Sequence, residues 1–173
     1  MKNDFIKPIL VLTCICLLVS GALAVTNGVT QPVIADAAAM RSEEAIRNAI
    51  PEAEGFEQIT TEGFPDTVKE AYRSTNNVGY VFIIGTSGYG GDMQLICGVS
   101  PDGSILRCAT LEHSETKGLG SRITDTQFEQ QFAGVDDRME GVQALTGATI
   151  SSTAYISAVR DALEAFSIVR GAE

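Results

Sequence analysis

Seven residues that lead into a predicted C-terminal helix combine hydroxyl groups with small side chains: Thr146-Gly147-Ala148-Thr149-Ile150-Ser151-Ser152. Gly147 and Ala148 leave the backbone accessible to a ligand. Ser151 and Ser152 can cap the helix, whose unpaired N–H groups and positive dipole end favour a phosphate group. The hydroxyl of Thr149 could be joined to that phosphate. Taken singly, the pattern is more typical of a routine helix cap than of an anion site.

A second polar segment directly follows a predicted strand and reads His113-Ser114-Glu115-Thr116-Lys117-Gly118-Leu119-Gly120. Glu115 and Thr116 offer an acceptor and a hydroxyl group at the end of the strand. Gly118 and Gly120, on either side of Leu119, allow a sharp backbone course close to a ligand. An exposed polar turn is the alternative interpretation of this segment alone.

Several common chemistries are excluded by composition. The chain has one histidine, which excludes a multi-histidine metal site, and it has no C-x-x-C-H motif for c-type haem. Only two cysteines follow the N-terminal apolar segment, too few for an iron–sulfur cluster within one chain. No phosphate-binding G-x-x-x-x-G-K-S/T loop or dinucleotide-binding G-x-G-x-x-G motif occurs after a predicted strand.

The elements that must position the two segments follow from periodicity and from helix and turn signals. They predict an α+β fold, in which an antiparallel or mixed sheet is packed with helices. We predict helices at residues 35–50, 66–72, 124–132 and 152–168, strands at 80–86, 93–99 and 105–111, and a loop at 52–64.

Cys97 and Cys108 flank a predicted hairpin turn, Ser100-Pro101-Asp102-Gly103-Ser104. Proline at its second position and glycine at its fourth favour a type I turn closed by a left-handed glycine. That register places Cys97 opposite Arg107 and Cys108 opposite Ile96, so the two thiols point to opposite faces of the sheet. We therefore expect no disulfide between them.

The N-terminal segment is predicted to meet a membrane. No charged residue lies between Lys7 and Asp36, and residues 9–25 would span roughly 25 Å as a helix. Lys2 and Lys7 favour a cytoplasmic N-terminus. We expect a transmembrane anchor and linker at residues 1–34, with residues 5–29 in the lipid bilayer, and an extracytoplasmic domain at residues 35–173. A cleaved signal peptide is the alternative, and it places the domain on the same side.

The domain is strongly acidic. Residues 31–173 include 10 basic and 21 acidic side chains, a net charge of −11. Such a surface repels phosphate backbones, so we expect no nucleic-acid partner. It suits a soluble domain or one that docks a basic partner.

Together and in this order, the two polar segments resemble the FMN-binding domain family, and within it the G subunits of Rnf ion-translocating electron transport complexes. These are similar to the C subunit of sodium-translocating NADH:quinone reductase. In the family the segments read H-S-E-T-P-G-L-G and S/T-G-A-T-x-S/T. The resemblance covers about residues 41–165. Two positions depart from the pattern: Lys117 stands where proline is common, and Gln143 stands where the flavin transferase usually reads an aspartate.

The resemblance implies FMN esterified through its phosphate to Thr149. It also implies contacts between the flavin and the rest of both segments. The implied binding residues are Thr146, Gly147, Ala148, Ser151, Ser152, Glu115, Thr116, Gly118, Leu119 and Gly120.

The function implied by the resemblance is electron transfer within a Na⁺- or H⁺-translocating ferredoxin:NAD oxidoreductase complex, without a complete active site on this chain. The implied partners are the other complex subunits, a flavin transferase for maturation and, given the acidic surface, an external multihaem cytochrome. Two alternatives stay open: a stand-alone extracytoplasmic flavin carrier for another reductase, and a non-redox, membrane-tethered binding module.

Overall fold

The computed structural model describes the backbone of residues 2–172 and the side chains of residues 6–34, 37 and 40–171. The chain divides into two compact units, Met1–Arg41 and Ser42–Glu173. The boundary lies within helix α1 (Lys2–Ala49), which is continuous although it contains Pro8 and Pro32. The stretch Ile6–Ile34 of this helix is long and apolar enough to cross a membrane.

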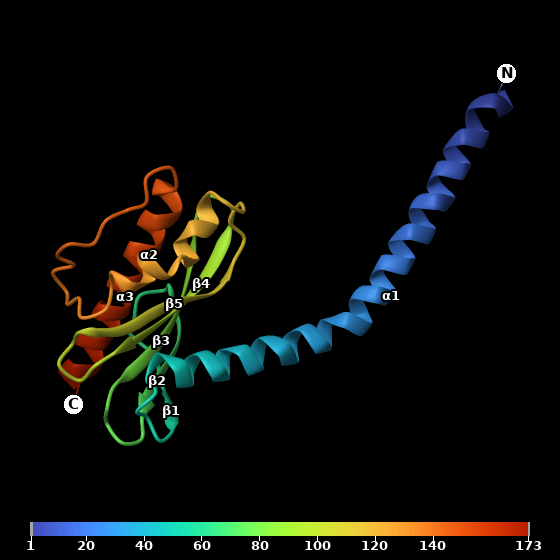
Figure 1. Ribbon diagram of the computed structural model, residues 1–173. Coiled ribbons are helices and arrows are strands. Elements are labelled where there is room, and N and C mark those ends of the chain that lie inside the picture. Colours follow the sequence, from blue (N-terminus) through green and yellow to red (C-terminus); the bar gives the residue numbers. More distant parts are fainter. Residues whose placement is uncertain (1, 173) are drawn as a thin grey trace. The chain divides into compact units, whose positions relative to one another are not determined.

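The second unit is built around one five-stranded antiparallel sheet with strand order β1-β2-β3-β4-β5 (Figure 1). Every strand therefore pairs with its neighbour in sequence, and the predicted α+β class is confirmed. The elements after α1 are β1 (Phe56–Ile59), β2 (Val68–Ser74), β3 (Tyr80–Ser87), β4 (Asp92–Val99), β5 (Ile105–His113), the 3₁₀ helix η1 (Gly120–Thr124), α2 (Thr126–Gln130) and α3 (Thr149–Ala172).

The central strand β3 is buried on both faces because its side chains alternate between two apolar clusters. Phe82 and Ile84 belong to the larger cluster, which α2 and α3 cover. Val81 and Ile83 belong to the smaller one, which the last turn of α1 covers with Ile46 and its neighbours. The sheet is therefore a middle layer between helices, and the long helix α3 is fixed along one face.

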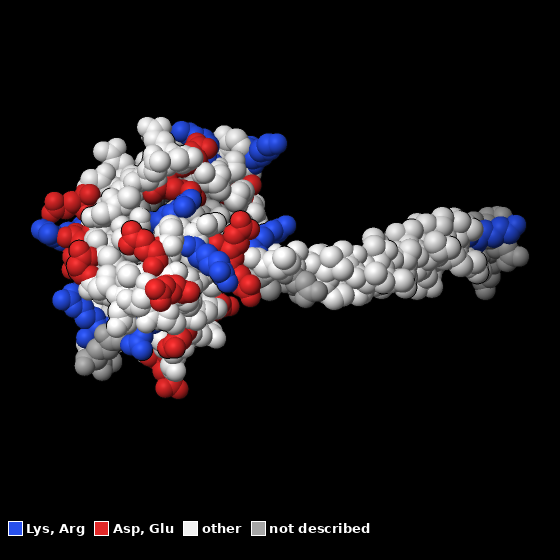
Figure 2. Space-filling view, turned by 60° about the horizontal axis from the view of Figure 1, so that its bottom comes forward, with Lys and Arg blue, Asp and Glu red and all other residues white. Residues whose placement is uncertain are grey.

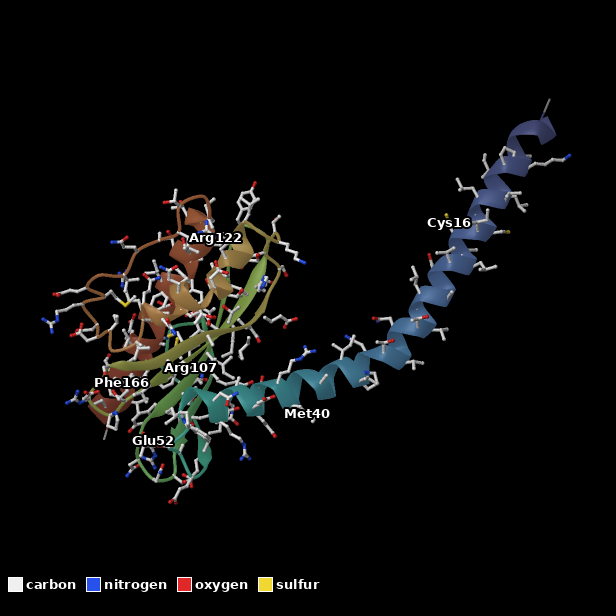
Figure 3. The ribbon with its side chains drawn as sticks, viewed as in Figure 1. Cys16, Met40, Glu52, Arg107, Arg122 and Phe166 are labelled. Atoms are coloured by element: carbon white, nitrogen blue, oxygen red, sulfur yellow. The ribbon has the colours of Figure 1, made fainter. Side chains whose placement is uncertain are left out.

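Aromatic side chains join α2 and α3 beneath the sheet. Tyr155 of α3 stacks on Phe132 with ring centroids 5.1 Å apart, and it meets the edge of Phe128 at 5.2 Å. Nearer the C-terminus of α3, Phe166 has its ring centroid 5.5 Å from that of Tyr80 of β3; Phe166 is labelled in Figure 3. The first two contacts hold the N-terminal half of α3 against α2 and the residues that follow it, and the third holds its C-terminal half against β3.

Two expectations about the first half of the domain are wrong. Residues 66–72 lie largely in strand β2 and not in a helix, and β1 lies within the predicted loop at 52–64. Val68 and Ala71 of β2 are buried by their neighbours in the sheet. This burial and the pairing of β2 with both β1 and β3 outweigh the local helix signal, because strand preference depends mainly on tertiary contacts.

The hairpin turn is as predicted, but the register beyond it is not. Ser100 N–H donates to Ser104 O at 2.8 Å, and Gly103 has φ +92°. The register then shifts between Gly98 and Val99, since Val99 pairs with Ile105 while Gly98 pairs with Arg107. This bulge places Cys97 directly opposite Cys108, so the expectation that their thiols point to opposite faces is wrong.

Candidate functional site

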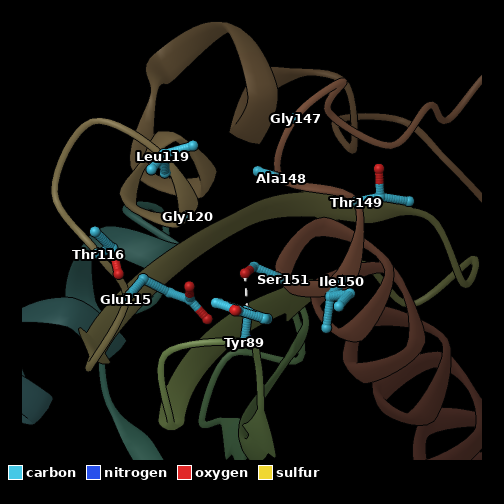
Figure 4. A pocket seen from close by; sticks show the side chains of 10 residues that line it. All are labelled: Tyr89, Glu115, Thr116, Leu119, Gly120, Gly147, Ala148, Thr149, Ile150 and Ser151. Carbon is cyan, nitrogen blue, oxygen red and sulfur yellow. Dashed lines mark hydrogen bonds between the residues drawn. The ribbon is translucent and has the colours of Figure 1, made fainter.

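A cavity of about 340 Å³ lies where three segments meet: the β3–β4 connection, the segment after β5, and the start of α3 (Figure 4). Its volume lies within the usual range for small-molecule sites. Glu115 and Thr149 lie on different sides of it. The lining residues are Tyr89, Glu115, Thr116, Leu119, Gly120, Gly147, Ala148, Thr149, Ile150 and Ser151.

Thr149 is the first residue of α3, and its side chain is exposed to solvent. The N–H of Ser152 makes the first hydrogen bond of helical spacing, to the carbonyl oxygen of Ala148, the residue just before the helix, at 2.9 Å. The preceding N–H groups, from Thr149 to Ser151, are therefore free of intrahelical bonds at the cavity. An exposed hydroxyl beside such a helix end is suited to carry a phosphate group.

Ser152, a residue of α3, fixes the loop before this helix through its side-chain hydrogen bonds. Ser152 Oγ accepts a hydrogen bond from Leu145 N at 2.9 Å and donates to Ala148 O at 2.9 Å. Gly147 has φ +84°, a left-handed conformation that favours glycine. Because α3 begins three residues earlier than predicted, Ser151 and Ser152 are helical residues and not caps. Ser151 Oγ instead accepts the N–H of Tyr89 at 3.4 Å (Figure 4).

Glu115 places a buried carboxylate at the cavity, with 8% of the residue exposed. Its Oε1 accepts the N–H of Gly90 at 3.1 Å, whereas Oε2 has no hydrogen-bond partner among the described residues. A Cβ on Gly120 would lie 2.7 Å from the carboxylate carbon, and one on Gly88 would lie 3.1 Å from it. Glycines thus make the space that this carboxylate fills, and its second oxygen remains available to a donor from a ligand.

We expect Gly120→Ala to displace the Glu115 carboxylate, because the added methyl group would overlap Oε2. Overpacking of this kind costs about 1–3 kcal/mol, and it would also disturb binding of the flavin that the sequence leads us to expect at this cavity. Gly118→Ala is the matched control: its φ of +79° disfavours alanine, but its Cβ meets no atom within 4 Å. The melting temperature and the flavin content should both fall more for Gly120→Ala than for Gly118→Ala. Equal flavin content in the two variants would contradict a role for the carboxylate.

Three large apolar side chains are exposed around the cavity: Tyr89 at 74%, Leu119 at 57% and Ile150 at 59%. Such a group is suited to cover a planar ligand. Tyr89 and Ile150 were not predicted as site residues. For Tyr89, a large aromatic residue within a glycine-rich connection was the available signal, and Ile150 lies inside the predicted segment at a position that the motif leaves variable.

Three predicted binding residues do not line the cavity. Ser152 is buried beneath it, and Gly118 forms a turn in which its N–H donates to Ser121 Oγ at 2.9 Å. Thr146 faces a neighbouring cavity that also includes Gln143, and its carbonyl accepts a hydrogen bond from Arg122 at 3.3 Å. The other eight predicted binding residues all line the cavity.

Comparison with known proteins supports one family. A protein-family model described as an FMN-binding domain matches residues 88–164, which include both polar segments. The G subunit of an ion-translocating oxidoreductase complex from Methanosarcina acetivorans is 33% identical over 185 residues, covering 98% of each chain. The G subunit of a proton-translocating ferredoxin:NAD(+) oxidoreductase complex from Clostridium ljungdahlii is 29% identical over 163 residues, covering 88% of this chain and 86% of that protein.

The fold has a counterpart among solved structures. NqrC from Shewanella oneidensis superposes with a TM-score of 0.51 at 19% identity, over 72% of this chain and 74% of that one. That likeness shows a shared fold, and the Methanosarcina protein shows relationship over nearly the whole length. The chain therefore belongs to the FMN-binding domain family, among the G subunits of ion-translocating oxidoreductase complexes.

Proposed function

We propose that this chain carries electrons through FMN attached covalently, by a phosphoester, to Thr149. The observation that carries the proposal is the position of Thr149: an exposed hydroxyl at the N-terminus of α3, at the edge of a cavity of suitable size. Formation of the ester joins the hydroxyl oxygen of Thr149 to the phosphorus of FMN, and in the net balance the hydroxyl proton leaves with one phosphate oxygen as water. The free N–H groups at the start of α3 would stabilise the phosphate charge.

The residues around the cavity fit a flavin. The unpartnered Oε2 of Glu115 would accept a hydrogen bond from an N–H donor of the ring. The apolar groups of Tyr89, Leu119 and Ile150 would cover the ring and exclude water. When bound, FMN supplies the redox chemistry, and the protein holds the ring and tunes its potential.

We further propose that residues 1–34 are a membrane anchor and linker and that residues 35–173 are an extracytoplasmic FMN-binding domain. The span Ile6–Ile34 has basic side chains at its N-terminal side, Lys2 and Lys7, which favours a cytoplasmic N-terminus. Acidic and basic side chains are interspersed over the visible face of the domain (Figure 2). The net charge of −11 over residues 31–173 suits a basic partner, including a multihaem cytochrome outside the membrane.

The curated relatives are named as subunits of oxidoreductase complexes. We infer that this chain assembles with the corresponding subunits, relays electrons in a ferredoxin:NAD oxidoreductase that translocates ions, and is matured by a flavin transferase. Gln143, which replaces the aspartate usually read by that transferase, is exposed, and its N–H donates to Gln131 Oε1 at 2.9 Å.

We expect Glu115→Gln to raise the midpoint potential of the bound flavin. A buried carboxylate disfavours the extra negative charge of the reduced ring, and the amide removes that charge while keeping the shape. A rise of about 30 mV corresponds to roughly 1.4 kcal/mol for a two-electron couple. Glu112→Gln is the control, because Glu112 is exposed on β5. Spectroscopic redox titration measures the midpoint potential of the flavin in both variants. Equal potentials would show that Glu115 does not lie near the flavin ring.

The role in the complex is tested by affinity purification of the intact membrane complex through a tag on this chain. Reduced ferredoxin should bleach the absorbance of the flavin bound to this chain, and NAD⁺ should restore it. A complex carrying Thr149→Ala should lack this signal and lose ferredoxin:NAD activity. Full activity without the flavin would contradict the electron-carrying role.

A further inference from the structure

We propose that Cys97 and Cys108 form a disulfide across the β4–β5 hairpin in the mature protein. The proposal rests on the extracytoplasmic location proposed above, because disulfides form and persist mainly in oxidising compartments. It assigns a structural bridge to two residues that do not line the flavin cavity.

The geometry of the pair is suitable. Cys97 and Cys108 are directly opposite each other in the antiparallel pairing of β4 and β5. Residues opposed in this way have Cα atoms about 4.5–5.5 Å apart, within the range that a disulfide bridges. Their sulfur atoms, which belong to free thiols in the structure, lie 2.6 Å apart, close to the roughly 2.05 Å of an S–S bond.

Both sulfurs lie in the main apolar core. Cys97 is 0% exposed and Cys108 is 2% exposed, in the cluster that also includes Tyr155 of α3. Burial, followed by the contact with Cys97, raises the pKa of the Cys108 thiol well above its ordinary value. Because the thiolate is the reactive form, oxidation of the folded domain would be slow. The bond would therefore form while the hairpin is assembling and its thiols are still accessible.

The oxidant belongs to the class of disulfide-bearing thiol oxidoreductases. The thiolate of one cysteine attacks the disulfide of the oxidant, which forms a mixed disulfide and releases one thiol of the oxidant. The thiolate of the second cysteine then attacks the sulfur of the first cysteine in this mixed disulfide. The bond between Cys97 and Cys108 forms, and the second sulfur of the oxidant is released. Cys97 and Cys108 together lose two protons and two electrons, and the oxidant leaves as a dithiol.

The bridge would stabilise the hairpin that leads into the flavin site. It would close the loop from Cys97 to Cys108 around the turn at residues 100–104. At the other end of the same strand pair, His113 of β5 pairs with Met93 and begins the polar segment that carries Glu115. Reduction of a bridge that closes a loop of this length should lower the melting temperature by about 10 °C.

The chain supplies its own control. Cys14 and Cys16 lie two residues apart on helix α1, a spacing that points their side chains away from each other, and both are free. They should remain thiols in the same preparation. The variant Cys14→Ala/Cys16→Ala leaves only the hairpin pair and should keep the domain unchanged.

The test uses the full chain in membranes of a host with an oxidising extracytoplasmic compartment. Acid-quenched, denatured protein is labelled with a polyethylene-glycol maleimide before and after reduction. Of the four cysteines, two should react before reduction and all four after it. For Cys14→Ala/Cys16→Ala, we expect no label before reduction and two after it, with the melting temperature falling when reductant is added.

Two labelled thiols in Cys14→Ala/Cys16→Ala before reduction would overturn the proposal. Protease accessibility of the domain in intact cells, measured on the same culture, separates the causes. If the thiols are free and the protease reaches the domain, only the disulfide proposal is wrong. If the thiols are free and the domain is protected from the protease, the proposed extracytoplasmic location is wrong as well. Flavin fluorescence of the denatured band reports the flavin proposal independently of both.

Discussion

Thr149→Ala should abolish covalent flavin on this chain without unfolding it. The hydroxyl of Thr149 is the atom proposed to form the phosphoester, and alanine has none. The side chain is exposed at the first position of α3, where alanine is well tolerated, so the stability of the domain should change by only about 0.5 kcal/mol. Thr149→Ser keeps a hydroxyl group and should retain part of the modification.

The measurement is ultraviolet-excited flavin fluorescence of the denatured band after co-expression with a flavin transferase. Thr153→Ala is the matched control, because Thr153 is also an exposed threonine near the start of α3 but lies outside the motif and does not line the cavity. Its band should fluoresce like the wild type. Fluorescence that persists in Thr149→Ala would assign the attachment to another residue, and an equal loss in Thr153→Ala would show that the effect is not specific to Thr149.

Phe132→Ala should have the largest effect on stability. The ring of Phe132 is 0% exposed, stacks on Tyr155 at 5.1 Å and meets Phe128 edge-on at 5.5 Å. Removal of a fully buried phenylalanine side chain costs about 3–5 kcal/mol, a large part of the roughly 5–15 kcal/mol that stabilises a typical domain. Since Tyr155 lies on the same helix as Thr149, the loss should also loosen the flavin site.

Denaturant unfolding of the full chain in detergent, followed by tyrosine fluorescence, measures this effect. Leu106→Ala is the control, because Leu106 is a large apolar residue that is 42% exposed at the bulge of β5. Its free energy of unfolding should change by about 0.5 kcal/mol or less. Similar losses in the two variants would show that the aromatic cluster does not anchor α3.

The parts of the fold that the sequence predicts best are those with local, periodic signals. β3 to β5 and α3 follow from β-branched content, turn residues and helical spacing. β1 and β2 do not, because their strand state depends on pairing with neighbours. The bulge that brings Cys97 opposite Cys108 could not be predicted either, since the turn residues specify only the first pair beyond the turn.

The sequence predicts the two polar segments of the site, but it does not predict the cavity that they form together with other residues. The residues that resemble the family motif include Glu115 and Thr149, which the structure places around one cavity although they come from different elements. Tyr89 was missed because only the three-dimensional fold brings the β3–β4 connection to the start of α3. The burial of Glu115 among glycines was likewise hidden, because those glycines lie in two separate segments.

Covalent attachment of FMN to Thr149 should be visible in the mass of the denatured protein and of its peptides. After co-expression with a flavin transferase, the intact mass should rise by about 440 Da, the mass of FMN less water, as expected for a covalent modification. Fragmentation should place this increase on Thr149. An unmodified mass with all flavin released on denaturation, or an increase on another residue, would show that Thr149 does not carry covalent FMN.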